Sequence, residues 1–340
     1  MSLAAPRAFV RTILDRPSTA VLVVVIALGI GIAVGGPVIV RQIAAGLMLG
    51  SIYMMMAVAF TLTIGVLNFL NFTIPTLFML TGMVAWGLSA NGTVVGFAGP
   101  WAWLAALGLG ILVAVVASLV VERFTFRYLK VRHGDATEHA IPLVSSLGFL
   151  LIFEHLVLIA MGSDSQRFAV PFKSDVHVFG MVLGLPQLAS FIAAVAVVAC
   201  LSAILKRTKT GRALRTIAES PDTASLLGVE VGRIVPVVFI LTGLLAGIAG
   251  ALFTVNYGTV SPFMGDNVGN KAIAAMVLGG IGSIWGAIAG GLLVGVAETL
   301  SIHFFGGDSV QMVVWGLLLG IIILRPKGLF GAASIGKGKM

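Results

Sequence analysis

The chain has 340 residues, of which 59% are hydrophobic and 10% are charged, with a formal net charge of +8. Soluble globular domains carry roughly 45–50% apolar and about 25% charged residues, so this composition excludes a soluble fold. From Gln42 to Val121 there is no Asp, Glu, Lys or Arg. Because one membrane span needs about 20 apolar residues, this stretch predicts several spans and an all-α polytopic membrane protein.

The ionisable residues exclude several kinds of chemistry. Cys200 is the single cysteine and the five histidines are scattered, which argues against a disulfide framework and a metal site. The basic residues lie between apolar segments, so we interpret them as cytoplasmic loops rather than as a nucleic-acid surface. Without clustered His, Asp or Glu at membrane depth, a membrane-embedded enzyme is not favoured. We expect no catalytic residue and no bound cofactor.

In chain order, the first predicted element is a cytoplasmic N-terminus over residues 1–18, which carries three arginines. A cleavable signal peptide has an apolar core of about 7–15 residues, whereas Thr19–Val40 is uncharged throughout, so we expect a retained helix. A single transmembrane domain is predicted over residues 19–325, followed by a basic tail over residues 326–340. Hydropathy predicts about eight spans in it, near residues 19–40, 43–65, 68–88, 101–121, 142–161, 186–205, 233–255 and 309–325.

Lys and Arg gather in four regions: the N-terminus, Arg123–Arg132, Lys206–Arg233 and the tail from Arg325. The positive-inside rule predicts that all four, and hence both termini, face the cytoplasm of a bacterial inner membrane. The apolar stretch Lys271–His303 must then cross twice or not at all. Two crossings need about 40 residues, more than this stretch provides. We therefore predict a re-entrant or hairpin element.

The turn of this element is expected at three glycines, Gly279, Gly280 and Gly282, because glycine accepts irregular backbone, which survives at membrane depth only inside protein or along a cavity. Small residues at four-residue spacing predict close helix packing elsewhere. They are Gly46 and Gly50, Gly243 and Gly247, and the series Gly282, Gly286, Gly290.

The loop over residues 206–233 contains helix punctuation. Ser220 is a good N-cap, Pro221 suits the first helical position, Asp222 suits the positive end of a helix, and Gly228 suits the position after its last turn. Such a short helix is not stable alone. Its apolar Ala224, Leu226 and Leu227, together with Thr223, therefore predict either a docking partner or a helix that rests on lipid headgroups beside Arg212 and Arg215; the residues leave both open.

Ionisable residues inside spans are functional hypotheses by default. Glu154, beside His155, lies within the predicted span 142–161, and a carboxylate that only bonds helices together is the alternative. We expect Glu298 and His303, nearer a predicted boundary, to be solvated or capping. Asn256 and Tyr257 are expected to begin an external loop that holds Asp266, and these three are candidates for contact with an external partner.

Four segments carry a family resemblance. The chain resembles permeases of the branched-chain amino acid family of ABC importers, and the resemblance covers most of its length. Gly46–Phe72 resembles the N-terminal signature of that family and Ile217–Ile234 its cytoplasmic loop. Tyr257–Leu300 and Leu324–Gly331 resemble its C-terminal signatures.

The resemblance implies that Ser220–Gly228 is a coupling helix, seated on a cytoplasmic ATPase subunit. It implies as partners a homologous permease, two ATPase subunits and a periplasmic or lipid-anchored solute-binding protein, within membrane lipid. ATP and magnesium would be used by the ATPase. Residues 331–338 nearly spell a phosphate-binding loop, but Gly338 stands where Ser or Thr holds magnesium, so we expect no ATP site here.

The implied solutes are branched-chain or other hydrophobic amino acids, with urea, short amides and small carboxylates as alternatives. An ion-coupled secondary transporter or a channel, with Glu154 as its carboxylate, is the alternative of a different class. The sequence departs from the family at Thr73-Ile74-Pro75, where Ala-His-Gly is usual. Pro75 predicts a helix break nearby, and the pathway candidates are Ser51, Tyr53, Asn68, Asn71, Thr73, Thr76 and Glu154.

Overall fold

The computed structural model describes residues 17–89, 101–129, 140–168, 175–178, 181–326 and 328–330. Most of the predicted N-terminus, most of the basic tail and the near phosphate-binding loop lie outside these residues. The helices are α2 (Pro17–Leu67), α3 (Thr73–Leu88), α4 (Ala102–Val121), α6 (Ala140–Met161), α7 (Leu185–Arg207), α8 (Lys209–Glu219), α9 (Pro221–Leu226), α10 (Val231–Tyr257), α11 (Met264–Gly279), α12 (Ile284–Phe305) and α13 (Val310–Leu324).

Short elements join these helices: a π-helical turn over Glu122–Leu129, a 3-10 turn over Gly307–Ser309, and the strands β1 (Gln166–Arg167), β2 (Asp175–Val178), β3 (Met181–Gly184) and β4 (Thr259–Val260). Within the described residues, 7 helices are long and apolar enough to cross a membrane. The all-α polytopic architecture is therefore confirmed. The exact number of spans stays a prediction.

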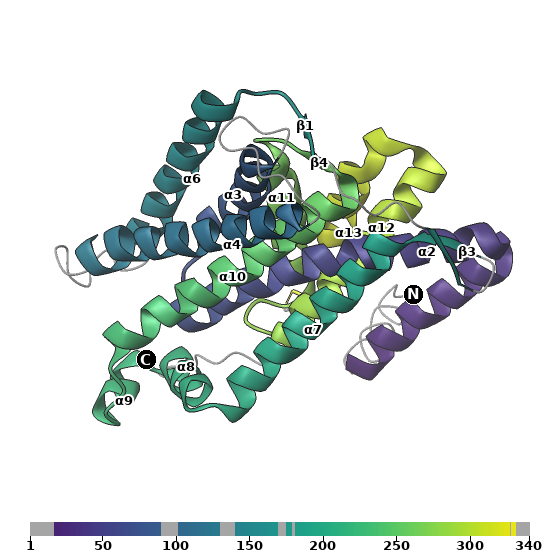
Figure 1. Ribbon diagram of the computed structural model, residues 1–340. Coiled ribbons are helices and arrows are strands. Elements are labelled where there is room, and N and C mark those ends of the chain that lie inside the picture. The colour runs from purple at the N-terminus through teal and green to yellow at the C-terminus, as the bar shows by residue number, and fades with distance from the viewer. Residues whose placement is uncertain are drawn as a thin grey trace, which may run out of the picture.

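The predicted boundary between the first two spans is wrong. Residues 19–40 and 43–65 belong to one helix, α2, whose 51 residues include Arg41 and Gln42. A charged or amide side chain does not end a helix by itself, because the backbone hydrogen bonds continue through it and both residues are good helix formers. In Figure 1 the darkest purple, N-terminal part of α2 runs at an angle to the rest.

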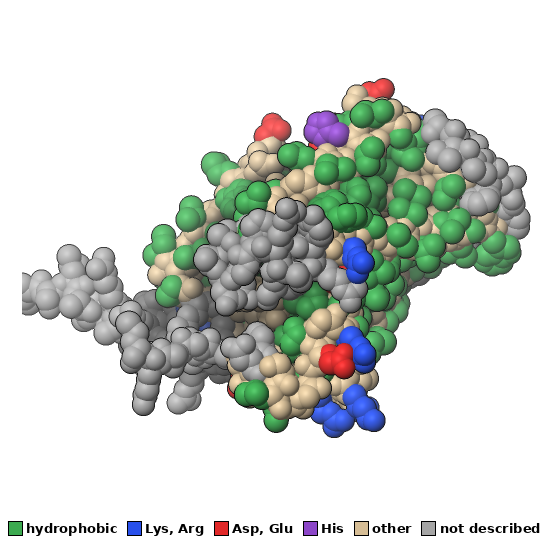
Figure 2. Space-filling view, turned by 90° about the vertical axis from the view of Figure 1, so that its left-hand side faces the viewer, with side chains coloured by type: hydrophobic (Ala, Val, Ile, Leu, Met, Phe, Trp, Pro, Cys, Tyr) green, Lys and Arg blue, Asp and Glu red, His purple; other side chains and the backbone are tan. Residues whose placement is uncertain are grey.

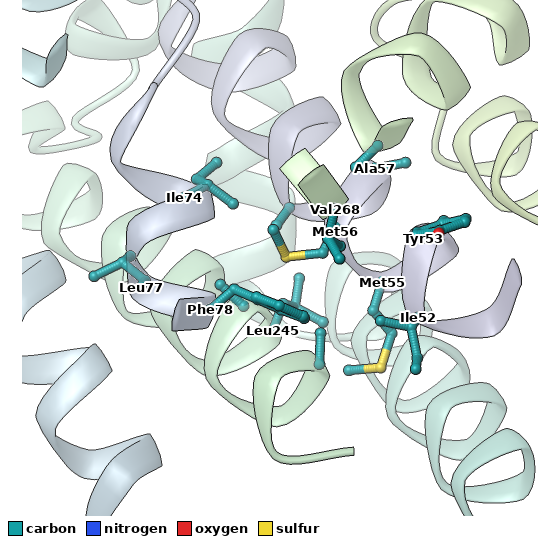
Figure 3. Close-up of a cluster of buried hydrophobic side chains, with 14 of the residues drawn as sticks. Ile52, Tyr53, Met55, Met56, Ala57, Ile74, Leu77, Phe78, Leu245 and Val268 are labelled. Carbon is teal, nitrogen blue, oxygen red and sulfur yellow. The ribbon is translucent and has the colours of Figure 1, made fainter. Parts of the chain in front are cut away.

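The core is built around the middle of α2. Every residue from Ile52 to Phe60 is at most 2% exposed, so this part of the helix is surrounded rather than packed along one stripe. Figure 3 shows its side chains against those of α3, α10 and α11, among them Phe78, Leu245 and Val268. An apolar helix that is buried all round lies in the interior of the bundle, so α2 is the element around which the others assemble.

Glycines set the closest helix contacts. A Cβ atom at Gly46 or Gly50 of α2 would meet the backbone of α12, and one at Gly295 of α12 would meet the backbone of α2. Gly243 and Gly247 of α10, which have the same four-residue spacing, likewise face α4. In lipid, where apolar surface alone gives little drive for association, such close approach allows van der Waals contact between helices.

The predicted element at 271–303 is a pair of helices. α11 has 16 residues and α12 has 22, and the chain breaks between them at Gly280, with φ 112°, and Gly282, with φ 85°. The break lies at the predicted glycines. The predicted start at Lys271 is wrong, because α11 begins at Met264 and Lys271 lies inside it. The additional residues from Met264 to Lys271 lengthen the element, which by itself was too short for two passes. How the pair lies in a membrane stays a prediction.

The connecting segments gather at two ends of the bundle. β1 pairs antiparallel with β4, so the segment after α6 meets the segment after α10. α10 separates β4 from α9 by 27 residues, about 40 Å at 1.5 Å per residue. Figure 1 accordingly shows β1 and β4 near the top and α8 and α9 at the lower left. Figure 2, which faces the left-hand side of that view, shows most of its Lys and Arg side chains low on a largely hydrophobic face, with acidic side chains at the top as well.

Candidate functional site

The short helix α9 is formed by local signals in the sequence. The Ser220 hydroxyl oxygen accepts a hydrogen bond from the Thr223 amide at 3.3 Å, and Pro221 occupies the first helical position. At the other end Gly228, with φ 80°, donates to the Ser225 carbonyl at 3.0 Å. These hydrogen bonds therefore satisfy backbone N–H and C=O groups that have no partner within a six-residue helix.

The helix α8 presents α9 at the surface. Thr208 caps α8 by accepting from the Gly211 amide, and Leu214 and Ile217 are buried on the inner face of α8. On α9, Ala224 is fully buried and therefore packs against this chain. The prediction that it faces a docking partner or lipid together with Leu226 and Leu227 is wrong. Leu226 is 87% exposed and Leu227 is 71% exposed. Two exposed leucines on a helix that is anchored at both ends form an apolar surface suited to a partner.

Several pathway candidates form the break before α3. The side-chain oxygen of Asn71 accepts from both the amide and the hydroxyl of Thr73, the first residue of α3, at 3.0 and 2.6 Å. Asn68 adopts φ 56°. The Phe72 amide donates to the Ser146 hydroxyl of α6 at 3.2 Å. Pro75 lies in the first turn of α3, where its missing N–H costs nothing.

The remaining candidates in this region are packed within the core. Ser51 donates to the Met48 carbonyl at 2.7 Å, and Thr76 is 4% exposed. Thr73 and Asn71 are fully buried, but the Asn71 amide nitrogen has no hydrogen-bond partner among the residues that the structure describes. These residues hold the broken segment in place, and their role as a pathway stays a prediction.

An ion pair that sequence reasoning missed joins three helices. Lys271 of α11 lies 2.6 Å from one Glu298 oxygen on α12, and the Tyr53 hydroxyl of α2 donates to the other at 2.7 Å. Lys271 also donates to the Tyr53 oxygen at 3.3 Å. Glu298 is 7% exposed, so the expectation that it is solvated or capping is wrong. A Lys and a Glu inside neighbouring apolar segments were the available signal, since buried charges are paired.

The Lys271–Glu298–Tyr53 cluster places opposite charges side by side and shields both from the apolar surroundings. Its hydrogen bonds join α2 to the consecutive helices α11 and α12, so the cluster fixes how these three helices pack together. Among the described residues, no group of His, Cys, Asp and Glu is arranged to hold a metal ion.

The segment just after α13 makes hydrogen bonds to the end of α11, beside the break between α11 and α12. The Leu329 amide donates to the Leu278 carbonyl at 2.9 Å, and the Phe330 amide donates to the Gly279 carbonyl at 2.8 Å. Arg325 donates to the Leu329 carbonyl at 3.2 Å. The segment after α13 thus satisfies carbonyl groups at the end of α11 that a helix terminus leaves open.

Glu154 remains apart from these contacts. It is partly exposed on α6, and it has no hydrogen bond or ion pair to any residue that the structure describes. The His155 ring is bonded to the Leu151 carbonyl at 2.8 Å. Asn256 and Tyr257 lie in the last turn of α10 rather than in a loop, and Asp266 lies exposed in the first turn of α11. His303, also exposed, lies in the last turn of α12.

Comparison with known proteins gives one consistent result. Residues 42–324 match the family described as branched-chain amino acid transport system / permease component. The chain is 31% identical to the permease protein BraD of Pseudomonas aeruginosa, over 87% of this chain and 97% of that protein. It is 29% identical to LivH of Escherichia coli over the same shares. A fructose import permease, FrcC of Rhizobium meliloti, is 35% identical over 36% of this chain and 34% of that protein.

Proposed function

Since this chain belongs to the branched-chain amino acid transport system permease family, we propose that it is a membrane-spanning subunit of an ATP-driven importer and forms part of its translocation pathway. A homologous permease, two ATPase subunits and an external solute-binding protein complete the assembly. The chain binds no ATP and no cofactor itself. The assembly sits in the inner membrane with both termini of this chain in the cytoplasm.

The exposed Leu226 and Leu227 carry the proposal of how transport is powered. They lie at the end of α9, which is capped at both ends and whose Ala224 is buried against the rest of the chain. Two leucines held this far out of the fold cost free energy in water, and burial in a groove of an ATPase subunit recovers it. The alternative, a helix that rests on lipid headgroups beside Arg212 and Arg215, is less favoured because the family to which the chain belongs implies a coupling helix at this position.

The proposed solutes are branched-chain or other hydrophobic amino acids. The support is the extent of the likeness to BraD and LivH, which spans 97% of each of those proteins, whereas the likeness to FrcC spans 34% of that protein. Asn256, Tyr257 and Asp266, at the end of the bundle opposite α9, are the proposed contacts for the solute-binding protein. Ligand titration of that partner, with urea and small carboxylates as competitors, identifies the solute.

Docking through α9 is tested by Leu226→Asp and Leu227→Asp in the assembled complex. A charge in an apolar groove is strongly unfavourable, so both variants are expected to lose stimulated ATP hydrolysis and uptake at normal membrane levels. Arg212→Asp, which adds a carboxylate at an exposed position on neighbouring α8, is the control and keeps both activities. Normal coupling in the two leucine variants would refute the assignment.

A further inference from the structure

A cavity of about 380 Å³ opens near the α8 end of the bundle. Its walls come from the end of α2, the end of α7, one face of α8 and the turn between α11 and α12. The lining is mostly apolar, but it includes Lys206 and Arg215 from two different helices. Among the described residues that line it, none is Asp or Glu.

Positive charge converges on this cavity. Lys206 lies over the Trp285 ring at 5.2 Å, so its ammonium group is held toward the turn before α12. Neither Lys206 nor Arg215 forms an ion pair with any residue that the structure describes. Ser283 and Trp285, at the start of α12, add the positive end of a 22-residue helix. The cavity thus offers two cations and a helix dipole to one anionic group.

The position of the cavity indicates where that anion comes from. The segments that line it are the last turns of the apolar spans Val38–Leu67 and Leu185–Arg207 and the first turn of Ile284–Phe305. Span ends lie at the depth of lipid headgroups, where Trp285, which is 60% exposed, is a typical residue. Basic pockets between helices at this depth bind phospholipid headgroups.

We propose that this cavity binds the phosphodiester headgroup of an anionic phospholipid, held by Lys206 and Arg215, with an acyl chain against the apolar wall. Because α8 carries α9 and Ser283 begins α12, the lipid joins the segment proposed to dock the ATPase to the transmembrane hairpin. Free phosphate would offer the same charge. It would leave the apolar part of the lining uncovered, which favours the lipid.

The proposal is tested with the purified full chain in neutral detergent micelles, where no anionic membrane surface contributes. Brominated phosphatidylglycerol should quench the Trp285 fluorescence, taken as the difference from Trp285→Phe, at lower concentration than brominated phosphatidylcholine. Lys206→Gln with Arg215→Gln should weaken phosphatidylglycerol binding by about fivefold per charge. Lys209→Gln with Arg212→Gln, which removes two cations of the same segment outside the lining, should leave binding unchanged.

A cavity-filling pair makes the test independent of charge. A Cβ atom at Gly65, which lines the cavity, meets nothing closer than 3.9 Å, and one at Gly108 on exposed α4 meets nothing within 4 Å. Gly65→Leu should therefore fold and displace the lipid, whereas Gly108→Leu should not affect it. Lys206→Arg with Arg215→Lys keeps the charges and should keep binding.

Three results would overturn the proposal. Equal quenching by the two lipids would show that the site does not distinguish the anionic phosphatidylglycerol headgroup from that of phosphatidylcholine. An equal loss in both pairs of glutamine variants would show that the lining cations are not special. Binding of inorganic phosphate, in place of lipid, that depends on Lys206 and Arg215 would assign the site to a free anion.

Discussion

At the scale of single residues, the Lys271–Glu298–Tyr53 cluster holds a largely buried ion pair. The side chains of Lys271 and Glu298 are 19% and 10% exposed, whereas those of the Arg233–Glu230 pair are 80% and 62% exposed. Both pairs have short N–O distances, so distance does not separate them. Burial separates the two pairs. Water screens the attraction within an exposed pair, whereas a buried charge that loses its partner has no water to replace it.

Glu298→Gln should therefore destabilise the chain by about 3 kcal/mol, since it leaves the Lys271 ammonium buried and unpaired. The combined variant Glu298→Gln with Lys271→Gln removes both charges and should recover much of the loss. Glu230→Gln on the exposed pair should cost less than about 1 kcal/mol. Thermal unfolding in detergent measures all three. Similar losses for Glu298→Gln and Glu230→Gln would contradict the structural role of the cluster.

Sequence reasoning could have paired Lys271 with Glu298, because both lie in one predicted apolar segment. The pairing is missed because the predicted segment begins at Lys271, and a charge at the boundary of an apolar segment needs no partner. The contribution of Tyr53 could not be foreseen, since nothing in the sequence says that this position of α2 faces α12. The Leu329 and Phe330 contacts were missed for the same reason.

At the scale of elements, glycine decides which helices touch. A Cβ atom at Gly295 would meet the backbone of Gly46 and Gly50, whereas one at Gly320 on α13 meets nothing within 4 Å. Four-residue glycine spacing was visible in the sequence, and it predicted contact faces. The partner helix of each face came only from the fold. The fold also shows that a Cβ atom at Gly282, the first glycine of the third series, meets nothing within 4 Å.

Gly295→Ala should push α2 and α12 apart and cost about 1–3 kcal/mol, because backbone cannot give way as a side-chain end can. Gly320→Ala makes the same chemical change on an exposed helix face and should be neutral or stabilising by up to about 1 kcal/mol, through helix propensity alone. Unfolding midpoints of the two variants, compared with the unchanged chain, check this. A stable Gly295→Ala variant would argue against the close α2–α12 packing.

The N-cap of α9 gives a second prediction at this scale. Ser220→Ala removes the side-chain acceptor for the Thr223 amide and should weaken α9 by about 1 kcal/mol. Amide hydrogen exchange over residues 221–228 should then be faster, and stimulated ATP hydrolysis lower. Ser220→Asp keeps a good N-cap and should preserve both. Unchanged exchange in Ser220→Ala would mean that packing through Ala224, not the cap, holds the helix.

At the scale of the whole molecule, composition alone predicted a polytopic all-α protein, and punctuation by Ser220, Pro221 and Gly228 placed α9 to within a residue or two. These predictions rest on local chemistry, which a sequence states directly. The single helix through Arg41 and the start of α11 at Met264 were missed because continuation of a helix depends on backbone hydrogen bonds and packing, which hydropathy does not record.

The two classes of transporter differ most in where the energy comes from. An ion-coupled carrier needs a carboxylate that changes its protonation or ion contacts, and Glu154 on α6 was the candidate for it. A subunit driven through α9 needs a partner instead. The measurement that separates them is uptake of labelled leucine, presented by the solute-binding protein, into vesicles that contain this chain and its partner permease.

We predict that uptake requires both the ATPase subunits and ATP, is lost in Leu226→Asp, and does not respond to an imposed proton or sodium gradient. Uptake by the permeases alone, driven by such a gradient and abolished by Glu154→Gln, would contradict the account.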